Sequence, residues 1–225
     1  MIKFWTELFE NLPDWGPQML RAAGETLQLT AASFILAMLI GSFVALVRRS
    51  DMAPLRWAAI LYIEVGRGTP ALVILFLIYF GLPAVSPNLQ FDSFTAAAIG
   101  LGLQGGAVMA EVFRAGIEAV DTGQREAALS LGLPPVDVLR FVVLPQALRI
   151  MLPPLCNYAV QLLKDTTLAS SVAAPEIMFR ARNLVMETYL SMQVYLLVAC
   201  IYLCFSIPMS HLASRLEARA RGGQR

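Results

Sequence analysis

Hydrophobic and polar positions along the chain separate into long apolar blocks divided by short charged segments. Ala31 to Val47 and Ala71 to Leu82 contain no charged residue, and Ser191 to Leu212 contains only His211 as a possible charge. A helix needs about 20 mainly apolar residues to cross the hydrocarbon core of a bilayer. The pattern predicts an all-α integral membrane protein with five transmembrane helices, at roughly 22–47, 57–82, 94–115, 147–172 and 190–213.

The composition indicates a helical membrane protein and argues against a soluble domain, a membrane barrel and a nucleic-acid-binding protein. The chain has 225 residues, of which 57% are hydrophobic and 15% charged, and its mean hydropathy is +0.64. Soluble domains are about 45–50% apolar and about 25% charged. Segments of about 10 residues with alternating polarity, which a membrane barrel would need, do not occur. The net charge is only +1 and basic residues form no stripe, so we expect no nucleic acid partner.

Basic residues orient the predicted helices, because cytoplasmic loops are enriched in Lys and Arg. Arginines follow the first, third and fifth helices, whereas the segment 83–93 after the second has none. The N-terminus is therefore predicted outside and the C-terminus inside. Arg180 and Arg182 fall on the outer side against this rule, and we place them on a short surface helix.

Three further segments complete the predicted organisation. Residues 1–21 are predicted to form an amphipathic segment at the membrane surface, with Trp5 and Trp15 at the interface. Residues 22–213 form the transmembrane domain, with a long cytoplasmic loop at about 119–149, and 214–225 form a basic cytoplasmic tail. No catalytic constellation and no metal-ligand spacing is present, so we expect no enzyme activity, cofactor or metal in this chain.

The cytoplasmic loop has the composition of a folded, docking element. A helix is predicted from Thr122, a possible cap, to Leu131, and Gly132 interrupts it. A second short helix is predicted from Asp137 to Val143 after two prolines. Loops of this length without a function are uncommon in compact domains.

The same loop carries an ordered motif. Glu126, Ala127 and Ala128 are followed by three intervening residues and Gly132, then by nine further residues, Val142, one more residue and the pair Leu144-Pro145. This series resembles the EAA loop of ABC-transporter permeases. Segments at 62–70, 79–83, 110–114, 143–148, 152–157 and 163–166 resemble the branch that imports polar amino acids. The resemblance covers about Gly24 to Leu212.

The resemblance implies a type I ABC importer permease fold and a set of partners. These are two copies of a cytoplasmic ABC ATPase, a second permease (self or a homologue), a periplasmic solute-binding protein and an amino-acid-like substrate, in a bacterial inner membrane. The chain contains no GxxxxGK[ST] phosphate loop, so ATP must be bound by another polypeptide. The residues expected to couple to the ATPase are Glu126, Ala127, Ala128, Gly132, Leu144 and Pro145.

Charged residues inside predicted membrane helices are candidates for the substrate pathway, because each costs about 2.5–3.5 kcal/mol at the centre of a helix. Glu64 and Arg67 are spaced to pair on one helix face, and Pro70 loosens the helix after Thr69. Counted back from Leu82 along a straight helix, Thr69 would lie roughly 20 Å from the outer face. A purely structural ion pair is the alternative for Glu64 and Arg67.

A second polar group lies in the fourth predicted helix. It consists of Lys164, Asp165 and Thr166, and Lys164 would lie about 21 Å in from Ile150 if the helix begins there. We expect Asp165 to receive the cationic group of a substrate, and a hydroxyl or helix end to receive its carboxylate. A packing ion pair that holds helices together is the alternative.

The third predicted helix carries small residues at every fourth position, Ala98, Gly102, Gly106 and Ala110. They predict close helix packing, either within the chain or at a dimer seam. Gln104 is a candidate for substrate contact on the same helix. Glu111 and Arg114 are interpreted as a structural pair at its inner end.

Rival functions remain open at this level. An importer for compatible solutes or opines would share these motifs, and substrate identity is beyond this sequence. A stand-alone secondary transporter is the alternative of a different class, but such proteins often have more helices and inverted repeats.

Overall fold

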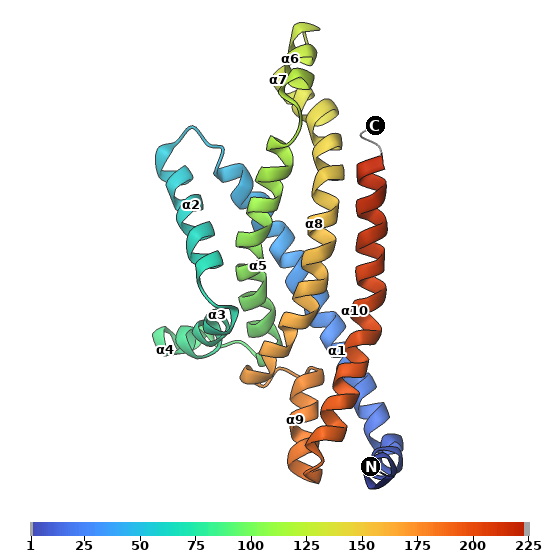
Figure 1. The fold of residues 1–225 in the computed structure, drawn as a ribbon. Coiled ribbons are helices and arrows are strands. Elements are labelled where there is room, and N and C mark those ends of the chain that lie inside the picture. Colours follow the sequence, from blue (N-terminus) through green and yellow to red (C-terminus); the bar gives the residue numbers. More distant parts are fainter. Residues whose placement is uncertain (1, 223–225) are drawn as a thin grey trace.

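The computed structural model describes residues 2–222 and the side chains of 3–218, and every regular element in this part is helical. The first helix, α1, runs without interruption over Ile2–Val47. It crosses behind the other helices in Figure 1, from the end that carries the N-terminus to the opposite end. The predicted segment 1–21 and the first predicted membrane helix are thus parts of one helix.

The N-terminal half of α1 is packed within the chain. Trp15 is 3% exposed and Met19 1% exposed, in a cluster with Ile177 and Leu184 of helix α9 (Ile177–Thr188). The prediction that Trp15 lies at the membrane interface is therefore wrong for this chain, because α9 and the last helix cover it. Trp5, which is 45% exposed, remains available to an interface.

The second predicted membrane helix is broken at Thr69. Helix α2 spans Ala53–Gly68, and α3 (Ala71–Phe76), a π-helical segment (Leu77–Gly81) and α4 (Leu82–Val85) follow at a bend of 108°. Thr69 has φ −94° and ψ 131°, as expected for a residue before proline. The depth predicted for Thr69 along a straight helix is therefore wrong, since the chain turns sideways there (Figure 1).

Helix α5 (Ser93–Glu118) is the centre of the bundle. Asp92 caps it and accepts a hydrogen bond of 3.0 Å from the Thr95 amide. The small residues face α1: a Cβ at Gly102 would lie 2.6 Å from Leu36, and one at Gly106 would lie 2.6 Å from Ile40. The interpretation as packing within the chain is confirmed.

The remaining elements extend the bundle at both ends. Helices α6 (Thr122–Ser130) and α7 (Pro135–Asp137), a π-helical segment (Val138–Val143) and α8 (Leu144–Asp165) follow α5. A 3-10 helix (Thr166–Val172), α9 and α10 (Ser191–Gly222) complete the chain. The π-helical segment precedes Pro145, which has no N–H to offer the Phe141 carbonyl four residues earlier.

The described helices give a polytopic membrane protein. Four of those within residues 2–222 are long and apolar enough to cross a bilayer, and the bent pair would make five. Helices α6 and α7 project beyond the bundle at the end near the C-terminus, and α9 lies at the other end near the N-terminus (Figure 1). The predicted basic tail continues α10 to Gly222, and 223–225 lie outside the described residues.

Candidate functional site: coupling hairpin and transmembrane path

The projecting hairpin is formed by α6, α7 and the π-helical segment at 138–143. Asp121 caps α6 by accepting a 2.6 Å hydrogen bond from the Gly123 amide, so the cap lies one residue before the predicted Thr122. The base of the hairpin is apolar: Val120, Ala128, Val138 and Val143 are buried in one cluster with residues of α5 and α8. The hairpin is thus an ordered extension of the bundle.

Gly132 makes the turn at the tip of the hairpin possible. Its φ is +82°, in the region that favours glycine. The Gly132 amide donates to the Leu129 carbonyl at 2.9 Å, and the Leu133 amide donates to the Ala128 carbonyl at 3.3 Å. These two bonds form a Schellman motif that closes α6. The predicted interruption of the helix at Gly132 is confirmed by this geometry.

The hairpin displays apolar side chains that nothing in the described chain covers. Leu131 is 83% exposed and Val136 is 73% exposed, and Phe141 is exposed as well. Among the predicted coupling residues, Glu126, Ala127, Leu144 and Pro145 are also exposed, whereas Ala128 is buried and holds the hairpin together. An exposed apolar surface of this kind, outside the bundle, is typical of a protein docking surface.

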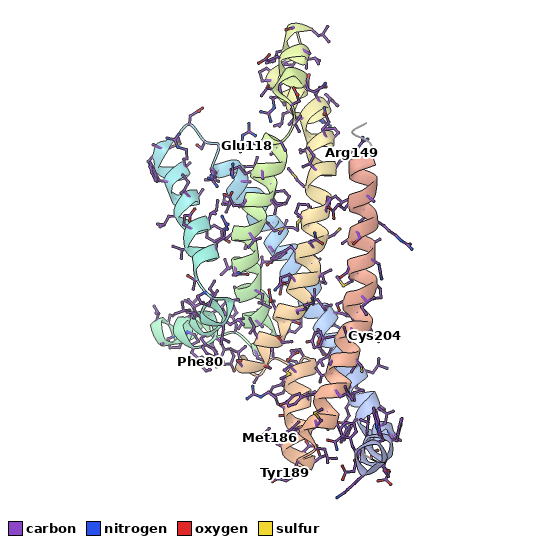
Figure 2. The ribbon with its side chains drawn as sticks, in the orientation of Figure 1. Phe80, Glu118, Arg149, Met186, Tyr189 and Cys204 are labelled. Carbon is purple, nitrogen blue, oxygen red and sulfur yellow. The ribbon has the colours of Figure 1, made fainter. Side chains whose placement is uncertain are left out.

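Ion pairs join the ends of α1 and α5 next to the hairpin. Glu111 of α5 accepts hydrogen bonds from Arg48, directly after α1, and from Arg114 at 2.8 Å. Arg114 also contacts Glu118, which Figure 2 places at the end of α5 below the hairpin. Glu111 and Arg114 therefore make structural contacts within the chain, as interpreted.

The candidate pathway residues of α2 are exposed in the isolated chain. Glu64 and Arg67 form no ion pair in the part of the chain that the structure describes, although their spacing would allow one. Thr69 lies at the break and donates its amide to Val65 at 3.0 Å. Pro70 begins the segment that runs sideways. The end of α2 therefore has polar side chains and backbone groups at the point where the helix is interrupted.

The candidates on α8 lie at the end of that helix. Asp165 is its last residue and accepts a 2.9 Å hydrogen bond from Gln161. Lys164 is exposed and, among the described residues, has no salt bridge. Thr166 is fully buried, and its hydroxyl donates to the Leu163 carbonyl at 2.7 Å. Gln104 is half-buried on α5. The structure therefore leaves Asp165 and Lys164 more accessible than Thr166.

Two tyrosines near α5 were not found from the sequence. The Tyr62 hydroxyl donates to the Leu103 carbonyl at 2.6 Å, which links α2 to α5. The Tyr158 hydroxyl on α8 is buried and has no hydrogen-bond partner among the described residues, and it lies 2.3 Å from where a Cβ at Gly105 would be. A single tyrosine in an apolar helix gives no periodic signal, so only the packing shows where it lies.

A second polar centre, at the end of the bundle opposite the hairpin, was also missed. Glu176 is 1% exposed and caps α9, accepting hydrogen bonds from the amides of Met178 (2.8 Å) and Phe179 (2.6 Å). Tyr202 of α10 donates to the same carboxylate at 3.2 Å, and the Thr26 hydroxyl of α1 accepts from the Ile177 amide at 3.1 Å. The local sequence can predict that a carboxylate caps a helix, but it cannot predict that two distant helices bury this carboxylate.

Next to this centre, a cavity of about 400 Å³ lies between α1 and α9. Its lining carries both charges: Arg21 and Glu25 come from α1, and Glu176 and Arg180 come from the α9 region. Arg180 and Arg182, which opposed the charge rule, lie on the short helix α9, as predicted. The Arg180 guanidinium donates a hydrogen bond to the side-chain oxygen of Gln18 on α1.

We expect a Glu176→Gln variant to lose a pH dependence of stability that the native chain has. Burial raises the pKa of Glu176 from 4.5 to about 7, against the opposing hydrogen bonds from Met178, Phe179 and Tyr202. The folded chain therefore binds a proton more tightly than the unfolded chain between about pH 4.5 and 7, so its stability falls as pH rises through that window. Glutamine keeps an acceptor oxygen for the α9 amides and carries no charge.

The measurement is the melting temperature of the purified chain in detergent, from about pH 5 to about pH 8. The variant should have a flatter profile and melt higher than the native chain at the alkaline end. Glu187→Gln, which removes an exposed carboxylate from the same helix, serves as the control and should keep the native profile. Identical profiles for native chain and Glu176→Gln would contradict the raised pKa.

Comparison with known proteins identifies the class of protein to which this fold and its hairpin belong. Residues 37–222 match the model of the family described as "Binding-protein-dependent transport system inner membrane component". The chain belongs to this family, and it is the membrane permease subunit of an ATP-driven importer. The subunit itself is not catalytic.

Individual relatives agree over most of the chain. It is 41% identical to the probable amino-acid ABC transporter permease protein YckA of Bacillus subtilis, over 83% of this chain and 81% of that one. It is 33% identical to the glutamine transport system permease protein GlnP of Escherichia coli, over 91% and 94% of the two chains.

Solved structures share the fold. A chain in the crystal structure of an amino acid ABC transporter with histidines is 36% identical, with a TM-score of 0.88 over 94% of this chain and 98% of that one. A chain of the MetNI methionine ABC transporter in an inward-facing conformation has a TM-score of 0.70 at 18% identity, over 90% and 98% of the two chains, and supports the fold alone. The chain therefore has the type I ABC importer permease fold.

Proposed function

We propose that this permease imports polar amino acids or close analogues across a bacterial inner membrane, with five membrane-crossing segments, the N-terminus outside and the C-terminus inside. The observation that carries the proposal is the ordered hairpin with its EAA motif and uncovered apolar tip. Relatives named for amino-acid and glutamine transport support the substrate class. The position of the hairpin at the C-terminal end of the bundle supports the orientation (Figure 1).

The partners follow from the same surface. Two copies of an ABC ATPase would each receive one hairpin, from this chain and from a second permease that is either another copy or a homologue. A periplasmic solute-binding protein would deliver substrate at the opposite end, where α9 and the cavity beside Glu176 lie. Closure of the ATPase dimer would move the hairpins and, through α5 and α8, the membrane path.

Within the membrane, the substrate would pass the broken helix and the end of α8. An interrupted helix offers backbone groups to a ligand inside a bilayer, which is a common way to build a transport site. The proposed path therefore takes in Thr69 with Glu64 and Arg67 on α2, Gln104 on α5, and Lys164, Asp165 and Thr166 at the end of α8. Thr166 would contribute only acceptor capacity, because its hydrogen is donated to Leu163.

Purification of the tagged chain in mild detergent tests the proposal, with the copurifying proteins identified by mass spectrometry. An ABC ATPase should copurify with the native chain, and Glu126→Lys should lose it, because the variant reverses the charge of an exposed hairpin residue. Glu187→Lys, on the opposite end of the bundle, should retain the ATPase. A native chain that purifies alone and carries solute along an ion gradient in vesicles would favour the secondary-transporter alternative instead.

For the path itself, we expect Asp165→Asn to lower transport at least about tenfold, the equivalent of 1.4 kcal/mol. Asparagine keeps an acceptor for Gln161 but loses the charge proposed to receive a substrate ammonium group. Uptake and substrate-stimulated ATPase activity of the reconstituted complex are the measurements. Asp92→Asn, which keeps the cap of α5, is the control. Unchanged transport by an assembled Asp165→Asn complex would remove Asp165 from the path.

A further inference from the structure

A small cavity with an excess of positive charge lies where the hairpin joins the membrane helices. It has a volume of about 180 Å³ and is lined by Ala45, Arg49, Arg114, Ile117, Glu118 and Arg125. A volume of this size holds roughly six water molecules at their share in the liquid, so it has room for a phosphate group. Three arginines and one glutamate give the lining a formal charge of +2.

The arginines of this lining differ in how far their charge is balanced. Arg114 is paired with Glu111 and Glu118. Arg49 is exposed and, within the described residues, has no ion pair or side-chain hydrogen bond. Arg125 donates one hydrogen bond to the Ile117 carbonyl, and its Nε is buried without a hydrogen-bond partner in the described part of the chain. The unbalanced charge therefore comes from Arg49 and Arg125.

A buried donor without a partner is costly, and a guanidinium presents several N–H groups in a planar fork that matches phosphate oxygens. An anion in the cavity would accept from Arg125 and at the same time neutralise Arg49. The cavity lies at the ends of α1 and α5, near Glu118 in Figure 2. In the proposed orientation, this is the level of the lipid headgroups of the cytoplasmic leaflet.

We propose that this cavity binds the phosphate group of an anionic ligand, and that an anionic phospholipid of the inner leaflet is its source. Such a ligand would connect Arg49, beyond the end of α1, to Arg125 of α6, and would hold the base of the coupling hairpin. The attraction is of the kind that basic pockets between membrane helices exert on anionic headgroups. The site lies apart from the apolar hairpin tip and does not depend on which solute is imported.

The full chain in nanodiscs tests this, by comparing phosphatidylglycerol with phosphatidylcholine as the only lipid. A ligand that binds the folded state raises its melting temperature, so phosphatidylglycerol should raise that of the native chain. Arg49→Gln combined with Arg125→Gln should lose most of this increase. Arg56→Gln, which removes an exposed arginine near the start of α2, should retain it.

A parallel titration of the chain in detergent with inorganic phosphate separates the two sources. A stabilisation by phosphate that the double variant loses, together with equal melting temperatures in the two lipids, would assign the site to a free anion and overturn the lipid source. Equal loss in Arg56→Gln, or full retention in the double variant, would show diffuse surface attraction and overturn the site. Arg49→Gln alone, which changes an exposed and unpaired side chain, gives the same readout if the double variant does not fold.

Discussion

Leu131→Asp is expected to remove the ABC ATPase from the purified complex while the permease stays folded. Leu131 is 83% exposed at the tip of the hairpin, so the isolated chain has little packing to lose. In the assembled importer, the same side chain would be buried against the ATPase. Burying a leucine contributes about 1.5–3 kcal/mol, and a buried unpaired carboxylate adds a further cost. We therefore expect the affinity for the ATPase to fall at least about tenfold.

The measurement is the binding of the separately purified ATPase to the permease in detergent, with the melting temperature of the permease recorded in parallel. Tyr189→Asp is a matched control, since Tyr189 is 87% exposed at the opposite end of the molecule (Figure 2). Its φ of 59° is also a conformation that aspartate accepts readily. Native affinity of Leu131→Asp would mean that the hairpin tip is not the docking surface.

The elements predicted best from the sequence are those with a local signal. The apolar blocks at 94–115 and 190–213 became α5 and α10, because a helix in lipid satisfies all its backbone groups internally and little else can compete. The hairpin was predicted nearly residue by residue, since Gly132 and the following prolines leave the backbone few choices.

The features that were missed depend on contacts between distant segments. Pro70 predicted a loosened helix after Thr69, but the 108° bend follows from how α3 packs beside α5 and not from the proline alone. Trp15 looked interfacial because tryptophan is common there, and its burial depends on α9, which lies more than 150 residues later. The Glu176 centre combines α1, α9 and α10 in the same way.

The small residues of α5 separate what residue spacing in the sequence predicts from what only the packing in the structure shows. Spacing alone predicted that α5 approaches another helix closely, and it left open whether the partner was in the same chain. The structure identifies α1 as the partner and shows that it contributes a glycine of its own, Gly41. A single glycine in an apolar helix gives no periodic pattern, so this half of the contact could not be predicted.

The contact at Gly41 is expected to tolerate no added atom. A Cβ there would lie 2.4 Å from the Cβ of Met109 and 3.0 Å from the backbone of Met109 and Ala110. Neither neighbour can rotate away, because both positions are fixed by the α5 backbone, so α1 and α5 would have to separate. Overpacking of this kind costs about 1–3 kcal/mol, occasionally more. Gly41→Ala should therefore destabilise the chain, although alanine favours a helix over glycine by about 1 kcal/mol.

Gly24→Ala isolates the packing effect from that helix preference. Gly24 lies on the same helix, and a Cβ there meets nothing within 4 Å. This control should leave the melting temperature in detergent unchanged or raise it, whereas Gly41→Ala should lower it, by roughly 2–4 °C for each kcal/mol lost in a chain of this size. If both variants were stabilised alike, α1 and α5 would have room to adjust. The small residues of α5 would then reflect helix approach elsewhere, and the seam with a second permease would again be the better explanation for them.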